Sequence, residues 1–399
     1  MNFKKFSIAM ALLAMSAVAQ KSNQKPVDDT KEIGFSQVRG CVYNSVANNL
    51  AGGLSVCDVL KSPSQFADKK FFYTGVEVNG EGEGYVSFGE GSKFILGYSQ
   101  SPNSQGEVGL MSLGYAASSF GLTLNLGLGM ETHTYTDQEG KEKVESTTYP
   151  GNIFALTFSM PLSSNLLSAH LLYTAFDKNY SNDVIENVNN EISLGVSFGN
   201  TLSNGDFFWE GGLRFDRYIS TEKDPDGTKS TREARSEVYP YFNIGYTALK
   251  DNVARVAWGF NNTIFIKAYD QFKPSDDVTE DHSLYGLQIS PNILGEILIN
   301  DNLIAFGEVV HNITIASSSQ TTSPKGSNDI VDKYTYIQSN PIPGLELPMA
   351  TTTAPTEVAV GLRLQGERAA IEARLANGFY RNIFQQDLFH GAINGFIYF

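Results

Sequence analysis

The sequence predicts an all-β fold, an antiparallel up-and-down barrel of about sixteen strands, with fourteen as the alternative count. Three observations predict it: a period of two along most of the chain, connections that alternate between long and short, and no apolar run of 18 residues after position 19. The 399 residues are 18% charged and 12% aromatic and include 37 Gly. That composition suits tight strands bordered by aromatic girdles.

Apolar residues alternate with small or polar residues from Phe71 onward. In 122–131 the even positions are apolar and the odd positions are small or polar. The same alternation recurs in 192–198, 238–246, 254–260 and 358–364. Because successive side chains of a strand point to opposite faces, such segments form strands with one apolar face. A soluble sandwich also alternates, so the connections have to separate the two folds.

Long and short connections between the expected strands alternate strictly along the chain. The strands are expected at 71–79, 83–90, 92–100, 107–117, 120–135, 149–160, 165–176, 188–199, 206–221, 234–248, 252–269, 281–298, 302–315, 355–366, 369–380 and 390–399. Long polar connections such as 137–141, 223–227 and 317–354 follow odd-numbered strands, and tight turns such as 90–91, 118–119, 203–206, 251–252 and 300–302 follow even-numbered strands. This alternation is typical of a transmembrane barrel with long outer loops and short inner turns.

One end of the chain resembles an export signal and the other resembles a membrane-insertion signal. Residues 1–19, with Lys4 and Lys5 before an apolar run and an Ala-x-Ala site, are expected to be a secretory signal peptide. No Cys follows the cleavage site, so a lipoprotein anchor is not indicated. The last strand resembles the C-terminal insertion signal of Gram-negative outer-membrane barrels, with Gly395, Ile397 and Phe399 as its residues. That resemblance implies an outer-membrane location, with membrane lipid and the barrel-assembly machinery as partners.

The segment 20–70 lies between the expected signal peptide and the expected barrel, 71–399. It holds both cysteines, Cys41 and Cys57. In an oxidising periplasm these are expected to form a disulfide, worth roughly 3 kcal/mol in the chain-entropy model. The alternative, a metal site, would need His or further Cys nearby, and the five His are dispersed.

The segment 20–70 is expected to be either a plug inside the barrel or a separate periplasmic tail. Its length and the small, apolar run 46–54 favour the plug. Glycine on a strand face allows another chain to approach closely. The inward positions of the barrel include several such glycines: Gly127, Gly129, Gly195, Gly245 and Gly259.

Strand parity predicts which charged residues face the interior. They are Glu210, Arg214, Asp216, Arg255, Glu357, Arg363, Glu372 and Arg374. A two-residue turn at 367–368 places Arg363 directly across from Glu372, where opposite charges attract. These residues are expected either to line a pore and filter solutes or to brace a wet interior.

Composition excludes several functions. The formal net charge of −14 argues against binding of nucleic acid or of anionic lipid through a polybasic patch. The segment 80–84 lacks the Lys and Ser/Thr of a phosphate loop and is expected to be a turn. No nucleophile elbow or acid–base constellation is present, so we expect no enzyme, no cofactor and no bound metal.

The whole pattern resembles outer-membrane porin-like proteins over 1–19 and 71–399. A weaker resemblance is to the fatty-acid-transporter type of barrel, although 49–51 is Asn-Leu-Ala where that family has Asn-Pro-Ala. Residues 136–148 are strongly polar, unlike the third loop of trimeric porins. The resemblance implies a channel for passive passage of small solutes. The alternative is a non-conducting barrel that serves as surface receptor, adhesin or secretion scaffold, and the oligomeric state stays open, a homo-oligomer included.

Overall fold

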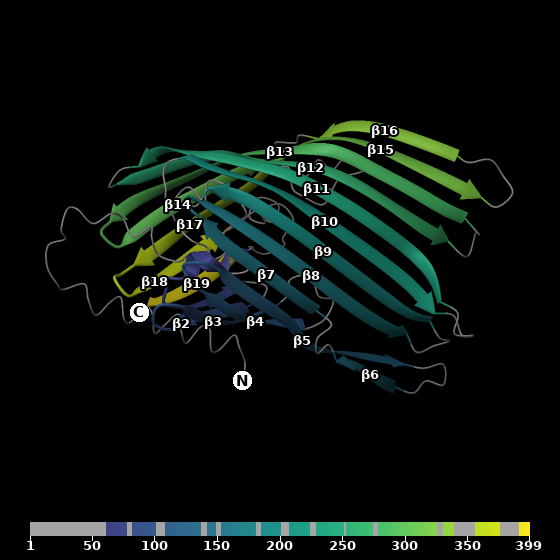
Figure 1. The fold of residues 1–399 in the computed structure, drawn as a ribbon, viewed down its shortest axis with the longest axis horizontal. Helices are drawn as coiled ribbons and strands as arrows, with labels where there is room; N and C mark the ends of the chain where they lie inside the picture. Colours follow the sequence, from purple (N-terminus) through teal and green to yellow (C-terminus); the bar gives the residue numbers. More distant parts are fainter. Residues whose placement is uncertain are drawn as a thin grey trace.

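A computed structural model shows the chain as a closed antiparallel barrel of 16 strands (Figure 1). The structure describes residues 61–77, 82–100, 108–136, 142–148, 153–180, 185–200, 207–223, 229–250, 253–273, 278–324, 330–338, 356–375 and 391–399. The expected signal peptide and most of the segment 20–70, with both cysteines, lie outside these residues.

The described elements are one short 3-10 helix and 19 strands. They are η2 (Pro63–Phe66), β1 (Phe71–Glu77), β2 (Gly82–Phe88), β3 (Lys93–Gln100), β4 (Val108–Ala116), β5 (Gly121–Thr136), β6 (Glu142–Thr148), β7 (Ile153–Leu162), β8 (Asn165–Tyr180), β9 (Ile185–Asn200), β10 (Phe207–Lys223), β11 (Lys229–Lys250), β12 (Ala254–Lys273), β13 (Val278–Asn300), β14 (Leu303–His311), β15 (Ile313–Pro324), β16 (Ile330–Gln338), β17 (Thr356–Gln365), β18 (Ala369–Leu375) and β19 (Gly391–Tyr398).

The barrel closes because β1 pairs with β2 on one side and with β19 on the other. Each expected strand except 302–315, which spans β14 and the start of β15, corresponds to one strand of this wall, and the predicted fold class is confirmed. The tight turns lie at the same end as the start of β1 and the end of β19. We take this end as the periplasmic end, because the short turns of outer-membrane barrels are periplasmic.

Two of the expected loops were wrong in part, because they contain strands. β6 pairs with the outer half of β5, and β15 pairs with β16 inside the predicted loop 317–354. Neither hairpin has a continuous apolar face: β6 is Glu-Lys-Val-Glu-Ser-Thr-Thr, and β15 is rich in Ser and Thr after Ala316. A hairpin that extends past the bilayer has water on both sides, so it needs no apolar alternation and gives no such signal.

The strand expected at 302–315 divides in two at Asn312. On the periplasmic side of this residue β14 pairs with β17, and on its outer side β15 pairs with β16. Both segments share β13 as their neighbour on the other side. Asn312 is buried, and its side-chain oxygen accepts hydrogen bonds from Ser290 Oγ at 2.6 Å and from Gln288 Nε2 at 3.2 Å.

Among the described residues, the strands of two parts of the wall differ in length. The tall wall consists of β8 to β13, with 16 to 23 residues per strand. The short wall consists of β14, β17, β18, β19 and β1 to β4, with 7 to 10 residues per strand. In Figure 1 the tall wall runs across most of the view, whereas β2 to β4 and β17 to β19 lie together at the left.

The outer face of both walls is apolar. Leu194, Leu213, Ile264, Ile293 and Leu362 are each exposed there. Outward aromatic rings follow one another near the periplasmic turns, with Phe94 and Tyr115 5.6 Å apart and Phe198 and Trp209 5.6 Å apart. An apolar band bordered by aromatic rings is the surface that a barrel presents to lipid.

No helix among the described residues is long and apolar enough to cross a bilayer.

The interior of the short wall is packed with aromatic side chains. One buried cluster gathers residues of η2, β1 to β4, β18 and β19: Phe66, Phe71, Tyr73, Tyr85, Ile95, Ala116, Ala370 and Phe396. Inward glycines receive the side chains of adjacent strands. A Cβ at Gly97 would collide with the Tyr85 ring and one at Gly195 with the His170 imidazole. Neighbouring side chains therefore fill the space at Gly195 and, through Ile153, at Gly127, where we expected another chain.

Candidate functional site: two inward polar clusters

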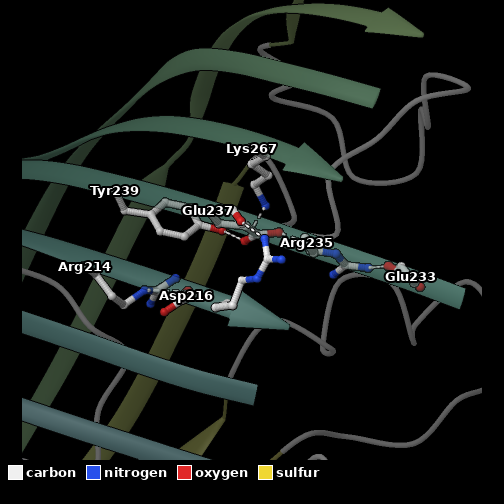
Figure 2. A network of polar contacts seen from close by, with 9 residues as sticks. Arg214, Asp216, Glu233, Arg235, Glu237, Tyr239 and Lys267 are labelled. Carbon is white, nitrogen blue, oxygen red and sulfur yellow. Dashed lines mark hydrogen bonds and ion pairs between the residues drawn. The ribbon is translucent and has the colours of Figure 1, made fainter. Parts of the chain in front are cut away.

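The first cluster is a charged network on the inner face of β10, β11 and β12 (Figure 2). We call it the tall-wall network; its members are Arg214, Asp216, Glu233, Arg235, Glu237, Tyr239 and Lys267. Register brings them together, because Arg214 pairs with Tyr239, Asp216 with Glu237, and Glu237 in turn with Lys267. The flanking residues Leu213 and Phe215 are exposed on the lipid side, so the network faces the lumen.

Ion pairs and ring contacts connect the members of the network. Arg214 Nε lies 3.0 Å from Asp216 Oδ2, and Lys267 Nζ lies 3.4 Å from Glu237 Oε2. The Arg214 guanidinium stacks 4.3 Å above the Tyr239 ring, whose hydroxyl donates to Glu237. Cation–π contact and carboxylate pairing fix the cations in place.

Further along β11, Arg235 Nη2 lies 2.7 Å from Glu233 Oε1 and Arg235 Nε lies 3.8 Å from Glu237 Oε1. On the other side of the network, Ser193 Oγ of β9 donates to Asp216 Oδ1 at 2.6 Å. The network therefore extends over four adjacent strands.

In each ion pair of the network the cation is more exposed than its carboxylate partner. The exposed side-chain fractions are 46% for Arg214 against 17% for Asp216, and 30% for Lys267 against 12% for Glu237. Arg235 is 45% exposed, more than either Glu233 or Glu237. The carboxylates thus lie close to the wall, and the cations reach furthest into the lumen.

The second cluster surrounds Arg363 in the short wall. The turn places Arg363 opposite Glu372, as predicted, and Arg363 Nη1 lies 3.3 Å from Glu372 Oε2 with both side chains only 2% exposed. Arg363 also donates to Tyr398 OH at 2.8 Å, and Asn394 donates to Glu372 Oε1 at 3.1 Å. The guanidinium lies 5.2 Å from the centre of the Phe396 ring. This arrangement is a buried, hydrogen-bonded ion pair.

The other predicted inward residues lie elsewhere on the wall. Glu210 accepts a hydrogen bond from Asn243 at 3.3 Å, nearer to the periplasmic turns than the tall-wall network. Arg255 is buried and pairs in register with Glu296 of β13. Arg374 is buried and lies across from Gly361, and Glu357 pairs in register with Val310. The charged residues predicted to face inward therefore lie at several separate places on the wall and do not form one site.

Sequence analysis missed five members of the tall-wall network: Glu233, Arg235, Glu237, Tyr239 and Lys267. Four of them fall inside expected strands, on the face opposite Val238 and Ile266. The alternation of inward and outward positions along these strands could therefore have identified these four residues. Glu233 lies before the expected start of its strand, because β11 begins at Lys229 in the structure.

The C-terminal strand lies between β18 and β1. Gly395 pairs with Thr74 and with Ile371, and Ile397 pairs with Phe72 and with Ala369. Phe399 is 74% exposed, and its amide donates to Lys70 O at 3.2 Å. At the same rim, the hydrogen bond from Lys70 to Glu90 lowers the pKa of that turn carboxylate.

Comparisons with known proteins give no family. No family model and no curated protein matches the chain. Among solved structures, the ferric yersiniabactin uptake receptor FyuA from Yersinia pestis is similar at 10% identity, over 77% of this chain, with a TM-score of 0.37. This chain covers 54% of that receptor, about half its length.

Two smaller barrels are also similar. A porin aligns at 12% identity over 83% of this chain and 100% of its own, with a TM-score of 0.28. The translocator domain of the autotransporter NalP from Neisseria meningitidis aligns at 10% identity over 84% of this chain and 90% of its own, with a TM-score of 0.28. Similarities this low carry no argument about function.

The assignment to a membrane comes from the barrel itself. Its ladder closes through β1 and β19, so the wall has no open edge there, and its outer surface is an apolar band. Only a helix or a closed barrel can satisfy its backbone groups in hydrocarbon. The chain is therefore an outer-membrane β-barrel protein.

Proposed function

We propose that the protein is an outer-membrane channel that passes small polar solutes. The observation that carries the proposal is the tall-wall network, in which charged groups on the lumen face are up to 46% exposed. Charges that only brace a wall are buried, as Arg363 and Glu372 are. Charged side chains that are exposed to water inside a barrel act on the solutes that pass through it.

The network also gives the channel a means of selecting among ions. Three cations project past their carboxylate partners, so a solute in the lumen meets Arg214, Arg235 and Lys267 first. In a confined space these charges are screened less than in bulk water. The proposal implies membrane lipid, the barrel-assembly machinery and small solutes as partners, and it assigns no catalytic role.

The test is single-channel recording in planar bilayers under a salt gradient. The wild-type protein should conduct, and replacing Arg214, Arg235 and Lys267 with Gln should move the reversal potential toward cation preference. The matched control is Arg217→Gln, since Arg217 lies on the opposite face of β10 and donates to Ser236 there. A folded, heat-modifiable wild-type sample that never conducts would refute the channel.

A second candidate is a non-conducting barrel that acts as receptor, adhesin or secretion scaffold. The aromatic cluster inside the short wall favours it, because Phe66, Tyr73 and Phe396 occupy interior space there. Absence of conductance together with specific binding of a partner at the outer surface would select this candidate.

A further inference from the structure

The residues just before the first strand lie inside the barrel, against its wall. We call Ser62–Lys70 the inner bar; it contains η2 and leads directly into β1. Its η2 helix contacts β4, β5 and β7, and Ser62 reaches Ser168 of β8. Around the wall, β1 and β8 are separated by β2, β3, β4, β5 and β7. The segment therefore lies inside the barrel, along the inner face of the wall from β1 to β8.

The position of the bar along the barrel axis follows from its contacts. Gly121, which begins β5, and Ser159 and Ser168, on either side of the turn between β7 and β8, are its wall partners. All three lie within a few residues of periplasmic turns. The bar therefore narrows the periplasmic mouth of the lumen.

One end of the bar is anchored by apolar packing. Phe66 is fully buried in the aromatic cluster of the short wall, and its ring lies 5.9 Å from that of Phe71. Ser87 Oγ donates to Lys69 O at 2.7 Å. An aromatic side chain buried among others leaves its place only at a high cost in free energy.

The other end is hydrogen-bonded to serine side chains of the wall. The Ser64 amide donates to Ser159 Oγ at 2.8 Å, and Ser159 Oγ donates to Ser64 Oγ at 2.8 Å. The hydroxyl groups of Ser62 and Ser168 lie 3.2 Å apart. Water can replace such neutral hydrogen bonds at little net cost. We call these serine contacts the latch.

The wall is shaped to seat the latch end. A Cβ at Gly121 would lie 2.6 Å from the carbonyl carbon of Pro63 and would collide with the backbone of Ser64. Backbone atoms cannot swing aside as a flexible side chain can. The missing side chain of Gly121 thus lets the bar sit flat against β5.

We propose that the inner bar is a gate of the channel, hinged at Phe66 and latched at Ser159 and Ser168. With the latch closed the bar narrows the periplasmic mouth, and with the latch open its Ser62 end leaves the wall and the mouth widens. The effect on conductance rests on the proposed channel function, whereas the docking and release of the bar do not.

The first test removes the latch. The double variant Ser159→Ala, Ser168→Ala should show a larger mean conductance than the wild type. The control is Ser112→Ala, because Ser112 is a buried inward serine for whose hydroxyl the described residues offer no hydrogen-bond partner. Heat-modifiable migration on gels checks that each variant has folded.

A second readout does not need conductance. Pro63→Cys places a thiol, the reporter thiol, at a position that is buried while the bar is docked and whose side chain takes no part in the latch. A membrane-impermeant maleimide should leave the reporter thiol unlabelled in the otherwise wild-type barrel and label it in the latch variant. Labelling of the wild-type chain, which carries Cys41 and Cys57, gives the background.

The second variant forces the bar off its seat by adding volume. Gly121→Val should raise both conductance and labelling of the reporter thiol, since the new side chain occupies the place of the bar. Its control is Gly295→Val, where a Cβ would meet nothing within 4 Å.

The outcomes separate cleanly. If the latch variant and Gly121→Val both keep wild-type conductance and a protected reporter thiol, the bar is a fixed part of the wall and the gate is refuted. Higher conductance with a protected reporter thiol also refutes it, because something other than the bar has moved. If nothing conducts but the reporter thiol becomes labelled, the bar is releasable and the channel function is what fails.

Discussion

The short wall and the tall wall share the same alternation of inward and outward side chains, but their inward side chains differ in exposure to water. In the short wall the inward positions carry aromatic rings and an ion pair that is 2% exposed at both ends. In the tall wall the inward positions carry an ion-pair network whose arginines are nearly half exposed. The short wall thus encloses a packed core, whereas the tall-wall network forms a lumen surface. The comparison shows that inward orientation alone does not make a charge part of a pore.

The largest difference between the walls should appear when an arginine is removed. Arg363→Ala leaves Glu372 buried beside nonpolar rings, and we expect a loss of about 3–5 kcal/mol in unfolding free energy. Urea unfolding in detergent, followed by tryptophan fluorescence, measures it. Replacing both partners with Leu should recover most of the loss, because no unpaired charge then stays buried. A loss below about 1 kcal/mol for Arg363→Ala would show that water reaches the short-wall interior.

Added volume should be the next most damaging change in the short wall. At Gly361 a Cβ would lie 2.6 Å from Ala373 O and would collide with the Phe306 ring, so Gly361→Val should cost about 1–3 kcal/mol. Gly307→Val is the control, since its nearest neighbour would be 3.8 Å away. Equal unfolding curves for the two variants would mean that the short wall has room to relax.

Removing an arginine from the tall wall should cost little stability. For Arg214→Ala we expect a loss below about 1 kcal/mol, because the Arg214 side chain is 46% exposed and water screens its pair with Asp216. The same variant should move the reversal potential more than the double variant Arg363→Ala, Arg374→Ala, whose residues are buried. If the double variant moves the reversal potential more than Arg214→Ala does, then Arg363 and Arg374, and not Arg214, face the conducting lumen.

The smallest effect on stability should come from the last residue. Phe399→Ser should change the unfolding free energy by no more than about 0.5 kcal/mol, since this side chain is 74% exposed. It should nevertheless lower the amount of barrel assembled in the outer membrane if the C-terminal signal acts as its resemblance implies. Membrane fractionation measures this amount, and Phe396→Leu, inside the aromatic cluster, is the matched control for an aromatic change in β19.

Sequence patterns predicted the wall but not the contents of the barrel. Period two and the phase of the connections gave the strands, and the turn at 367–368 gave the pairing of Arg363 with Glu372. Parity states only which face a side chain is on. It could not show that Tyr398 and Phe396 cover Arg363 while Arg214 stays open to water, because such cover comes from segments distant in sequence. The docking of Ser64 on Ser159, 95 positions away, leaves no periodic trace either.

The division of one strand at Asn312 has a consequence for how this protein can change over time. Closure of the barrel depends on the pairing of β14 with β17, and β15 and β16 take no part in that pairing. The hairpin above the branch is thus an insertion whose loss would leave the ladder below it intact. Evolution can lengthen, replace or delete this extension on the cell surface while the membrane-embedded part keeps its register. The branch at Asn312 separates the portion of the chain that must be preserved from a portion that is free to diversify.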